Sequence, residues 1–423
     1  MDSFKDLRRR KKYDKTELIT GCLAMFLFKE TSRNAFNNDR CKTKFKENYL
    51  KFFKKRLPHL DTVNTFLQQL EPDELEQLKA ALVSALIEQK VLHRFKQMGK
   101  HFTIAIDGTG TGSSAQNDDE QSMIHKTSKN NITTYFRYVL EAKLVTSSGL
   151  AISLASEWII NEPDRNFDKQ DCEQKAFVRL AVKLKKYFPR LPICILADGL
   201  YPNKTFMKTC EDNGWVYIVV LKDDNLKRLQ EDITDIEGKN RKSKNTFQAT
   251  EKGKKHIDQK HEWLTDTLEH GGYKVNWFSC TETITCYGKD GKIASVPQAT
   301  RFVYLTNIET DKCNICQLSQ AGRMRWRIEN EGFNTQKNLG YTLGHKYSRK
   351  SFKSCKNYYQ CLQIAHMINQ FAEHSQHIAA MLQSNKKLTL KHIWKDLIGL
   401  LSFTNLNESD FEIEIHFQIR LAG

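Results

Sequence analysis

Three acidic residues stand where they could hold divalent cations. Asp107 and Asp198 each end a short apolar run and are followed by a glycine, which lets a neighbouring backbone or a ligand approach closely. Glu329 comes much later, within a polar, arginine-rich segment. Carboxylate oxygens are ligands that Mg²⁺ and Mn²⁺ prefer, and converging carboxylates repel one another unless cations neutralise them. Two such ions about 3.5–4 Å apart can promote displacement at a phosphodiester.

The elements that would position the two aspartates alternate between strands and helices. The strand patterns are 101–107, 135–146, 150–159, 191–199 and 215–222, and the helix patterns are 168–187 and 202–213. Apolar strands alternating with helices indicate an α/β layer with a mixed sheet. Ligands of such sheets bind beyond the carboxyl ends of strands, so Asp107 and Asp198 should lie side by side if their strands are neighbours.

The regions before and after these strands differ in character. Residues 1–98 are basic and show helical spacing, with a buried helix expected at 18–28 and others beginning near Asp61 and Pro72. We expect this region to bind DNA, partly through the cluster Arg8-Arg9-Arg10. The remaining divisions are a core at 99–222, a β-rich insertion at 223–316, a return to the core at 317–375 and a tail at 376–423.

Within the insertion, a polar, lysine-rich stretch at 239–260 precedes strand patterns at 275–287 and 300–308, with a turn expected at 289–292. A helix spanning 317–338 then carries Glu329. Packing this helix against the sheet would bring its carboxylate to the edge where the two aspartates lie.

Composition limits the classes of protein that fit. The chain has 423 residues, 39% of them hydrophobic, and a net charge of +16. It has no apolar run near the roughly 18 residues that a membrane span needs, and no signal-peptide pattern at its start. Eleven cysteines, an odd number, favour reduced thiols and a cytoplasmic location. A basic protein of this kind most often has nucleic acid as its partner.

These motifs resemble those of the DDE transposases of bacterial insertion sequences, which have a ribonuclease-H-like core. The resemblance extends from about residue 62 to 370 and depends on three motifs, AIDGTGTG (105–112), ILADGLYP (195–202) and RWRIENEGFNTQKN (325–338). It is closest to the cut-and-paste enzymes with a β-rich insertion before the Glu helix. The expected fold is therefore a ribonuclease-H-like mixed sheet flanked by helices.

The resemblance also implies an activity. Asp107, Asp198 and Glu329 would be the catalytic residues and would bind Mg²⁺ or Mn²⁺. The enzyme would cleave and join DNA at the terminal inverted repeats and at target DNA, acting as a homodimer when two ends are brought together. Its place would be the bacterial cytoplasm, associated with the nucleoid. Hairpins in the flanking DNA are a property of related enzymes that the sequence leaves open.

DNA contacts are expected around the Glu helix. Arg325 matches the arginine that the family has four residues before the glutamate, and Arg327 is a further candidate. Two positions depart from the family motif. Gly322 stands in place of a tyrosine, and Gln336 in place of a lysine. Lys337 follows directly, about 100° further round an α-helix.

Several alternatives remain open. An Asp-Gly pair is often only a turn, and Glu331 competes with Glu329 for the metal site. The acidic group 118–120 is expected to be a solvated loop, and Cys313 and Cys316 to be idle thiols and not zinc ligands. Trp277 could stack on an unpaired base but more often such a residue belongs to the core. The whole protein could instead be a domesticated, inactive DNA-binding protein, or a nuclease that does not join strands.

Overall fold

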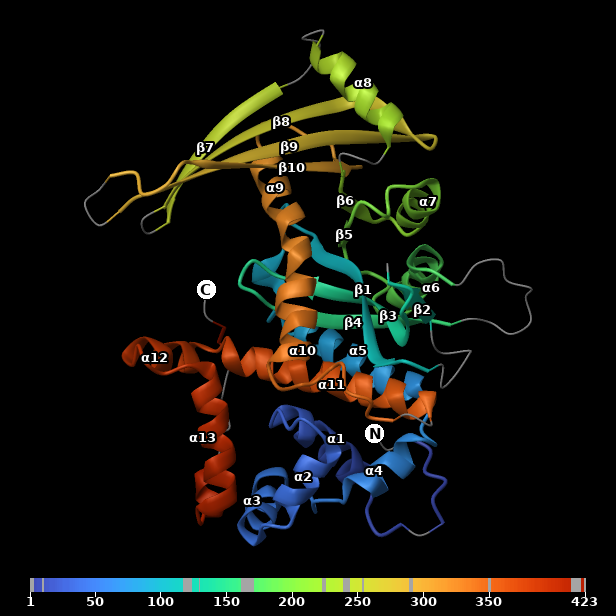
Figure 1. The fold of residues 1–423 in the computed structure, drawn as a ribbon, viewed down its shortest axis with the longest axis vertical. Helices are drawn as coiled ribbons and strands as arrows, with labels where there is room; N and C mark the ends of the chain where they lie inside the picture. The colour runs from blue at the N-terminus through green and yellow to red at the C-terminus, as the bar shows by residue number, and fades with distance from the viewer. Residues whose placement is uncertain are drawn as a thin grey trace.

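Strands from most of the chain form one open, mixed sheet (Figure 1). The computed structural model describes residues 4–9, 11–116, 124–128, 130–160, 171–222, 226–238, 244–252, 255–288, 292–348, 351–411 and 420–421. Within these ranges ten strands follow the order β2-β3-β1-β5-β6-β10-β9-β8-β7, and β4 also pairs with β3. Strands β1, β5 and β6 are parallel to one another, and the other pairings are antiparallel.

The strands of the sheet have the following bounds: β1 Phe102–Ser114, β2 Ile124–Thr127, β3 Thr133–Val145, β4 Ala151–Ile159, β5 Ile193–Ala197, β6 Val216–Val220, β7 Lys244–Lys252, β8 Lys255–His270, β9 Tyr273–Cys286 and β10 Gln298–Thr306. The α/β layer and all five strands expected between residues 101 and 222 are confirmed. Strand β2 had not been expected.

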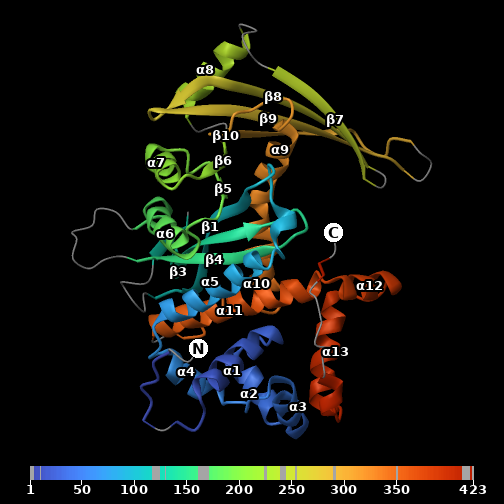
Figure 2. The same cartoon turned by 180° about the vertical axis from the view of Figure 1, so that it is seen from behind.

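Helices cover both faces of the sheet (Figures 1 and 2). The helices among the described residues are α1 Lys15–Leu27, α2 Arg33–Arg40, α3 Thr43–Phe53, α4 Leu60–Leu67, α5 Pro72–Glu88, α6 Glu173–Tyr187, α7 Lys204–Asp212, α8 Lys227–Gly238, α9 Ile315–Arg323, α10 Thr335–Asn338, α11 Phe352–Glu373, α12 Gln376–Ser384 and α13 Leu390–Phe403. Some of them, such as α12 and α13, lie away from the sheet (Figure 1). None of the helices in the described ranges is both long and apolar enough to cross a bilayer.

The helical N-terminal region is confirmed. Helix α1 begins with a capping box, in which the Asp14 carboxylate accepts from the Glu17 backbone and the Glu17 carboxylate accepts from the Asp14 backbone. Helix α5 begins at Pro72, as expected. Helix α4 begins at Leu60, because His59 caps it, so the cap expected at Asp61 was wrong by two residues.

The insertion is a continuation of the sheet, because β10 pairs with β6 of the core. We expected residues 239–260 to be a polar stretch before the strands, and this was wrong where the structure describes them: 244–252 and 255–260 belong to β7 and β8. The error has a physical cause. Strand β7 is an edge strand, where charged side chains protect the open edge and no buried face reveals a strand in the sequence. The turn expected at 289–292 falls mostly outside the described residues.

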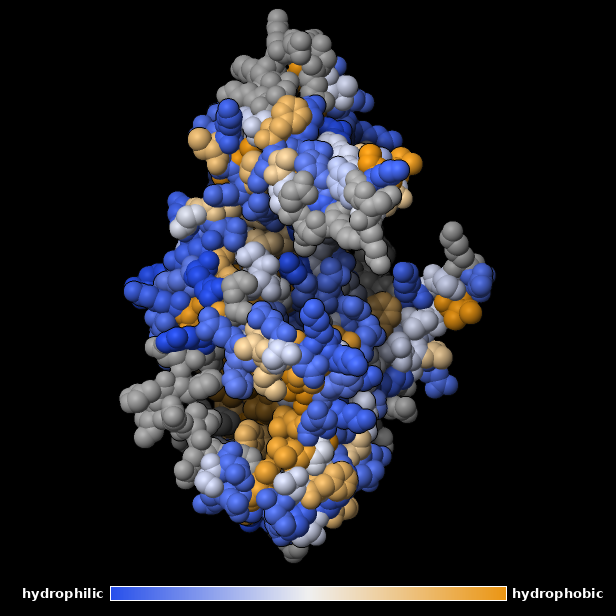
Figure 3. Space-filling model, turned by 90° about the vertical axis from the view of Figure 1, so that its left-hand side faces the viewer, coloured by the Kyte–Doolittle hydropathy of each residue, from blue (hydrophilic) through white to orange (hydrophobic). Residues whose placement is uncertain are grey.

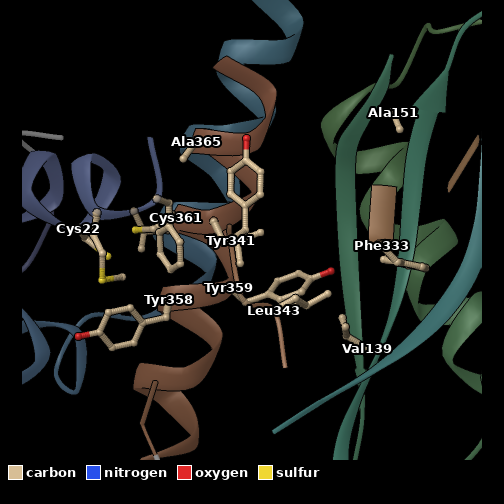
Figure 4. Close-up of a cluster of buried hydrophobic side chains, with 14 of the residues drawn as sticks. Cys22, Val139, Ala151, Phe333, Tyr341, Leu343, Tyr358, Tyr359, Cys361 and Ala365 are labelled. Atoms are coloured by element: carbon tan, nitrogen blue, oxygen red, sulfur yellow. The ribbon is translucent and has the colours of Figure 1, made fainter. Parts of the chain in front are cut away.

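Two apolar cores lie on the two faces of the sheet. One includes the N-terminal helices, α11 and the Glu helix, and Figure 4 shows Phe333, Val139 and Cys361 within it. The other is formed mainly by α6, α7 and the opposite faces of β1, β3 and β5. The side of the molecule seen in Figure 3 is largely hydrophilic, with hydrophobic residues gathered in its lower half.

Candidate active site

Asp107 and Asp198 are neighbours at one edge of the parallel strands. Strands β1 and β5 are paired in register over four residues, ending with Ala105 opposite Leu196. Continuing this register for two residues brings Asp107 opposite Asp198, and neighbouring strands are about 4.8 Å apart. The hypothesis that the two strands are adjacent is therefore confirmed.

We expected β1 to end at Asp107, and this was wrong. The strand continues to Ser114 because β3 pairs with it along that length. Gly108, which suggested a turn, is covered by the ring of Tyr138 from β3, and a Cβ atom there would overlap that ring. Asp107 thus lies within a strand, at the level where the neighbouring strand β5 has just ended.

Arg325 joins Glu329 to this edge. Its Nη1 atom lies 2.9 Å from Oε1 of Glu329 and 4.0 Å from Oδ2 of Asp107. Arg325 is only 8% exposed, so its guanidinium is held in one place between the two acids. The helix therefore brings Glu329 close to Asp107, with Arg325 between them.

Asp198 has two polar partners of its own. Its Oδ1 atom accepts a hydrogen bond of 2.8 Å from the Leu200 backbone, and its Oδ2 atom lies 3.1 Å from Nζ of Lys222. The stem of Lys222 crosses Gly199, where a Cβ atom would lie 2.8 Å from Cγ of the lysine. Both Asp-Gly pairs therefore use the glycine to admit a neighbouring side chain.

The side chains of the three acids remain partly open to solvent. Exposed fractions are 23% for Asp107, 29% for Asp198 and 49% for Glu329. Burial, followed by repulsion from Glu329, raises the pKa of Asp107 to about 7. Arg325 opposes this shift without cancelling it. Burial beside Glu329 therefore disfavours the ionised form of Asp107.

The described part of the chain contains no group of three or more His, Cys, Asp or Glu side chains arranged to hold a metal ion. The acids are instead paired with cations, since Asp107 and Glu329 face Arg325 and Asp198 faces Lys222. The backbone brings the three acids to one edge, while these ion pairs direct their carboxylates to separate partners.

Residues Ile328–Asn334 form a π-helical stretch. It helps to explain why Gln336 stands where the motif of the DDE transposases has a lysine. A turn closed by i→i+5 hydrogen bonds holds about one residue more than an α-helical turn, so residues after it are displaced by about one position. Gln336 is accordingly fully buried and bonds to Gln363 and His366. Lys337 lies close enough to Asp107 for their charges to interact, although burial is the larger effect and lowers the pKa of this lysine.

The tyrosine missing at Gly322 has a counterpart from another element. Tyr304 of β10 packs over Gly322, where a Cβ atom would lie 2.7 Å from its ring. The two residues line one cleft of about 430 Å³ that also includes Lys222, Arg325 and Trp326. This cleft adjoins the acids, because two of the residues that line it bond to them.

Other expected DNA contacts are placed elsewhere. Arg327 pairs with Glu331 and donates to the Ser147 carbonyl, away from the aspartates, which favours Glu329 over Glu331 as the third acid. Arg8 is buried, bonds to Asp6 and to the Tyr13 carbonyl, and therefore stabilises the N-terminal region and is not presented to DNA.

The other members of the basic cluster differ from Arg8. Arg9 is exposed, whereas Arg10 lies outside the described residues, as does the acidic group 118–120. Trp277 is 1% exposed, so the expectation that it belongs to the core is confirmed. Cys313 is an exposed free thiol and Cys316 a half-buried one.

A fourth acid at this edge was missed in the sequence. Glu173, the first residue of α6, accepts hydrogen bonds from Tyr138 at 2.6 Å and Tyr201 at 3.2 Å. It also contributes to the raised pKa of Asp107, after burial and Glu329. An acid in the first turn of a helix is common for electrostatic reasons, so the sequence held no signal that distinguished it.

Comparison with known proteins adds no family to this geometry. No protein-family model matches the chain, and no curated protein matches it.

Proposed function

We propose that the chain is a DNA transposase of the DDE type, from a bacterial insertion sequence, that acts by Mg²⁺-dependent phosphodiester hydrolysis and strand transfer. The observation that carries the proposal is the register of β1 and β5, which sets Asp107 opposite Asp198, together with the Arg325 contacts that join Glu329 to Asp107. We propose that these three carboxylates, which face the cations of Arg325 and Lys222 in this structure, converge on Mg²⁺ when it binds.

The strand order supports a ribonuclease-H-like core. In the series β4-β3-β1-β5-β6, the pairings of β4 with β3 and of β3 with β1 are antiparallel. The pairings of β1 with β5 and of β5 with β6 are parallel. The connections β4-α6-β5 and β5-α7-β6 place helices between strands, and the Glu helix follows the inserted strands. This arrangement agrees with the fold that the sequence motifs had implied.

The donor set fits hard divalent cations. Asp107, Asp198 and Glu329 offer only oxygen atoms. Burial and then Glu329 raise the pKa of Asp107, so a bound cation would favour its ionised form. Mg²⁺ or Mn²⁺ bound by these residues would favour ionisation of an attacking water or 3′-hydroxyl and stabilise charge on the leaving oxygen.

The cations beside the acids have a second use in this proposal. Lys222, whose side chain is 56% exposed, would turn to a DNA phosphate when Asp198 is engaged elsewhere, whereas the buried Arg325 would meet a phosphate from its place in the cleft. Lys337 follows on the same helix, and its charge interacts with that of Asp107. Together they would hold the scissile phosphate against the acids and orient it for in-line attack.

DNA is the partner that the charge favours. The net charge of +16, the exposed Arg9 and the basic N-terminal helices would bind the terminal inverted repeats and target DNA through phosphates. Bringing two transposon ends together implies a homodimer on DNA, and the proposed place of action is the nucleoid.

The test combines cleavage and joining assays with full-length protein, Mg²⁺ and DNA that carries the terminal repeats flanking its coding region. Asp107→Asn, Asp198→Asn and Glu329→Gln should each abolish cleavage and leave DNA binding intact. Glu331→Gln is the matched control, because that acid lies on the same helix and pairs with Arg327. It should retain activity.

Each result has a distinct meaning. Cleavage with strand joining supports the proposal, and cleavage alone identifies a nuclease. A gel shift without products identifies an inactive DNA-binding protein. Near-normal turnover in Glu329→Gln would remove that residue from the site.

A further inference from the structure

Glu173 connects two segments that flank the aspartate pair. One of its oxygens accepts from the Tyr138 hydroxyl at 2.6 Å and the other accepts from the Tyr201 hydroxyl at 3.2 Å. Each oxygen therefore has its own phenol, and the two phenols come from different elements.

Each tyrosine lies beside an aspartate or the residue that follows one. Tyr138 lies on β3 and covers Gly108, the residue after Asp107. Tyr201 lies in the loop after β5, and its backbone N–H donates to the Asp198 carbonyl at 3.2 Å. A movement of either phenol would therefore shift the backbone at the adjacent aspartate.

This arrangement lies behind the acids. Asp107 is paired with Glu141 across β1 and β3, so their side chains share a face of the sheet. Tyr138 is three residues from Glu141 on the same strand and therefore points to the opposite face, where α6 packs. Glu173 thus supports the edge from the face opposite the Glu helix.

Capping of α6 does not account for Glu173. Position Cys172 is the N-cap and makes no side-chain capping bond. The Glu173 carboxylate bonds to the phenols. Burial, followed by the charge of Glu173, raises the pKa of both tyrosines, so both phenols keep their protons and donate.

We propose that Glu173 is a positioning residue that, through Tyr138 and Tyr201, fixes the separation of Asp107 and Asp198 needed to bind a divalent cation. This inference rests on the proposed function, and it gives the site a fourth essential acid that does not itself bind the cation.

The experiment measures cation binding without DNA. Tb³⁺, a cation that also takes oxygen ligands, is titrated into full-length protein and followed by its emission on tyrosine excitation, with Mg²⁺ as competitor. The wild type should bind Tb³⁺, and Asp107→Asn combined with Asp198→Asn should not. Glu173→Ala, which keeps both tyrosines as sensitisers, should weaken binding about 10-fold.

Two further variants separate positioning from charge. Glu173→Gln can still accept from one phenol and donate to the other, so it should recover most of the affinity. Tyr138→Phe should weaken binding. Tyr347→Phe is its matched control, because that hydroxyl donates to the Tyr341 carbonyl at 2.9 Å and lies 3.0 Å from the Thr342 hydroxyl, away from the acids. Tyr347→Phe should bind Tb³⁺ like the wild type.

The outcomes distinguish this inference from the proposed function. Positioning by Glu173 is overturned if Glu173→Gln binds Tb³⁺ as weakly as Glu173→Ala does. It is also overturned if Tyr138→Phe and Tyr347→Phe bind Tb³⁺ with equal affinity. Either result counts even when the wild type cleaves DNA. Loss of Tb³⁺ binding in the expected variants supports it even when no DNA cleavage is found. A wild type that binds no Tb³⁺ overturns both.

Discussion

Glu141 and Asp107 face each other across β3 and β1, yet their surroundings differ completely. Glu141 is fully buried and accepts hydrogen bonds from Ser153 and Ser156, each at 2.8 Å, and from Tyr359 at 2.6 Å. Asp107 is 23% exposed, and its own backbone neighbour Gly108 is its one close donor among the described hydrogen bonds.

Cations deepen the contrast. Nζ of Lys79 lies 4.0 Å and Nζ of Lys143 lies 3.8 Å from Glu141, and both lysines are fully buried. Around Asp107 the surroundings differ, because burial and then the charge of Glu329 raise its pKa, and Arg325 opposes this shift only in part. The same strand pair therefore holds one acid that is satisfied by buried partners and another that is partly exposed and has few partners. The supply of partners, and not the residue type, separates the two roles.

The largest expected effect comes from removing the satisfied acid. Glu141→Ala leaves two buried lysines without their shared counter-charge and should lower the free energy of unfolding by about 3–5 kcal/mol. Urea unfolding followed by circular dichroism measures this. Asp107→Ala, from the opposite side of the pair, should change it by less than about 1 kcal/mol. Equal losses in the two variants would erase the distinction between the two acids.

A smaller effect is expected from two adjacent residues, of which one belongs to a buried hydrogen-bond network and the other lies near Asp107. Gln336 bonds within the buried network, whereas Lys337 lies near Asp107. Lys337→Ala should weaken binding to end DNA about 10-fold and reduce the slope of log affinity against log salt by about 1. Fluorescence anisotropy at several salt concentrations measures both quantities.

The control for this prediction places a lysine at position 336, where the DDE transposase motif has one. Adding Gln336→Lys to Lys337→Ala should not recover affinity, because position 336 is buried beside Gln363 and His366. Full recovery would show that the π-helical turn does not set which residue faces the acids.

The smallest effect concerns pH. Burial, opposed by Glu141, lowers the pKa of Lys143 to about 8 from an ordinary value of 10.5. Between these values the unfolded chain binds a proton that the folded protein has released, so the stability contributed by this group rises with pH. Relative to Lys143→Met, the wild type should gain about 1 kcal/mol between pH 7 and 9. A relative loss over that interval would contradict the depressed pKa.

The sequence predicted those elements whose burial follows a simple period. The residues of β1 before Asp107 and the whole of β5 are buried, and α1 and α5 have helical spacing with recognisable first residues. The end of β1 was misplaced because the ring that covers Gly108 comes from another strand. Strand β7 was missed because an edge strand needs no apolar face.

The site was predictable in its motif residues and not in their supports. Asp107, Asp198 and Glu329 stand out by position, whereas Glu141 and Glu173 are ordinary acids until the fold supplies tyrosines and lysines beside them. Arg8 looked like part of a surface cluster, but Asp6 and a backbone carbonyl bury its charge. Such partnerships depend on residues distant in the chain, which local patterns do not contain.

The π-helical turn that contains Glu329 holds about one residue more than an α-helical turn. The number of residues between two positions of this helix is therefore not a fixed measure of which way their side chains face. An additional amino acid in a regular helix would rotate all that follows, and the change would spread to every later contact. Here the widened turn absorbs it, and Gly332 within that turn leaves room for the Lys143 stem, because a Cβ atom there would lie 3.2 Å from Cδ of the lysine. A motif search with fixed spacing from Glu329 would consequently overlook chains in which the basic side chain is one residue later in the sequence but faces the same side of the helix.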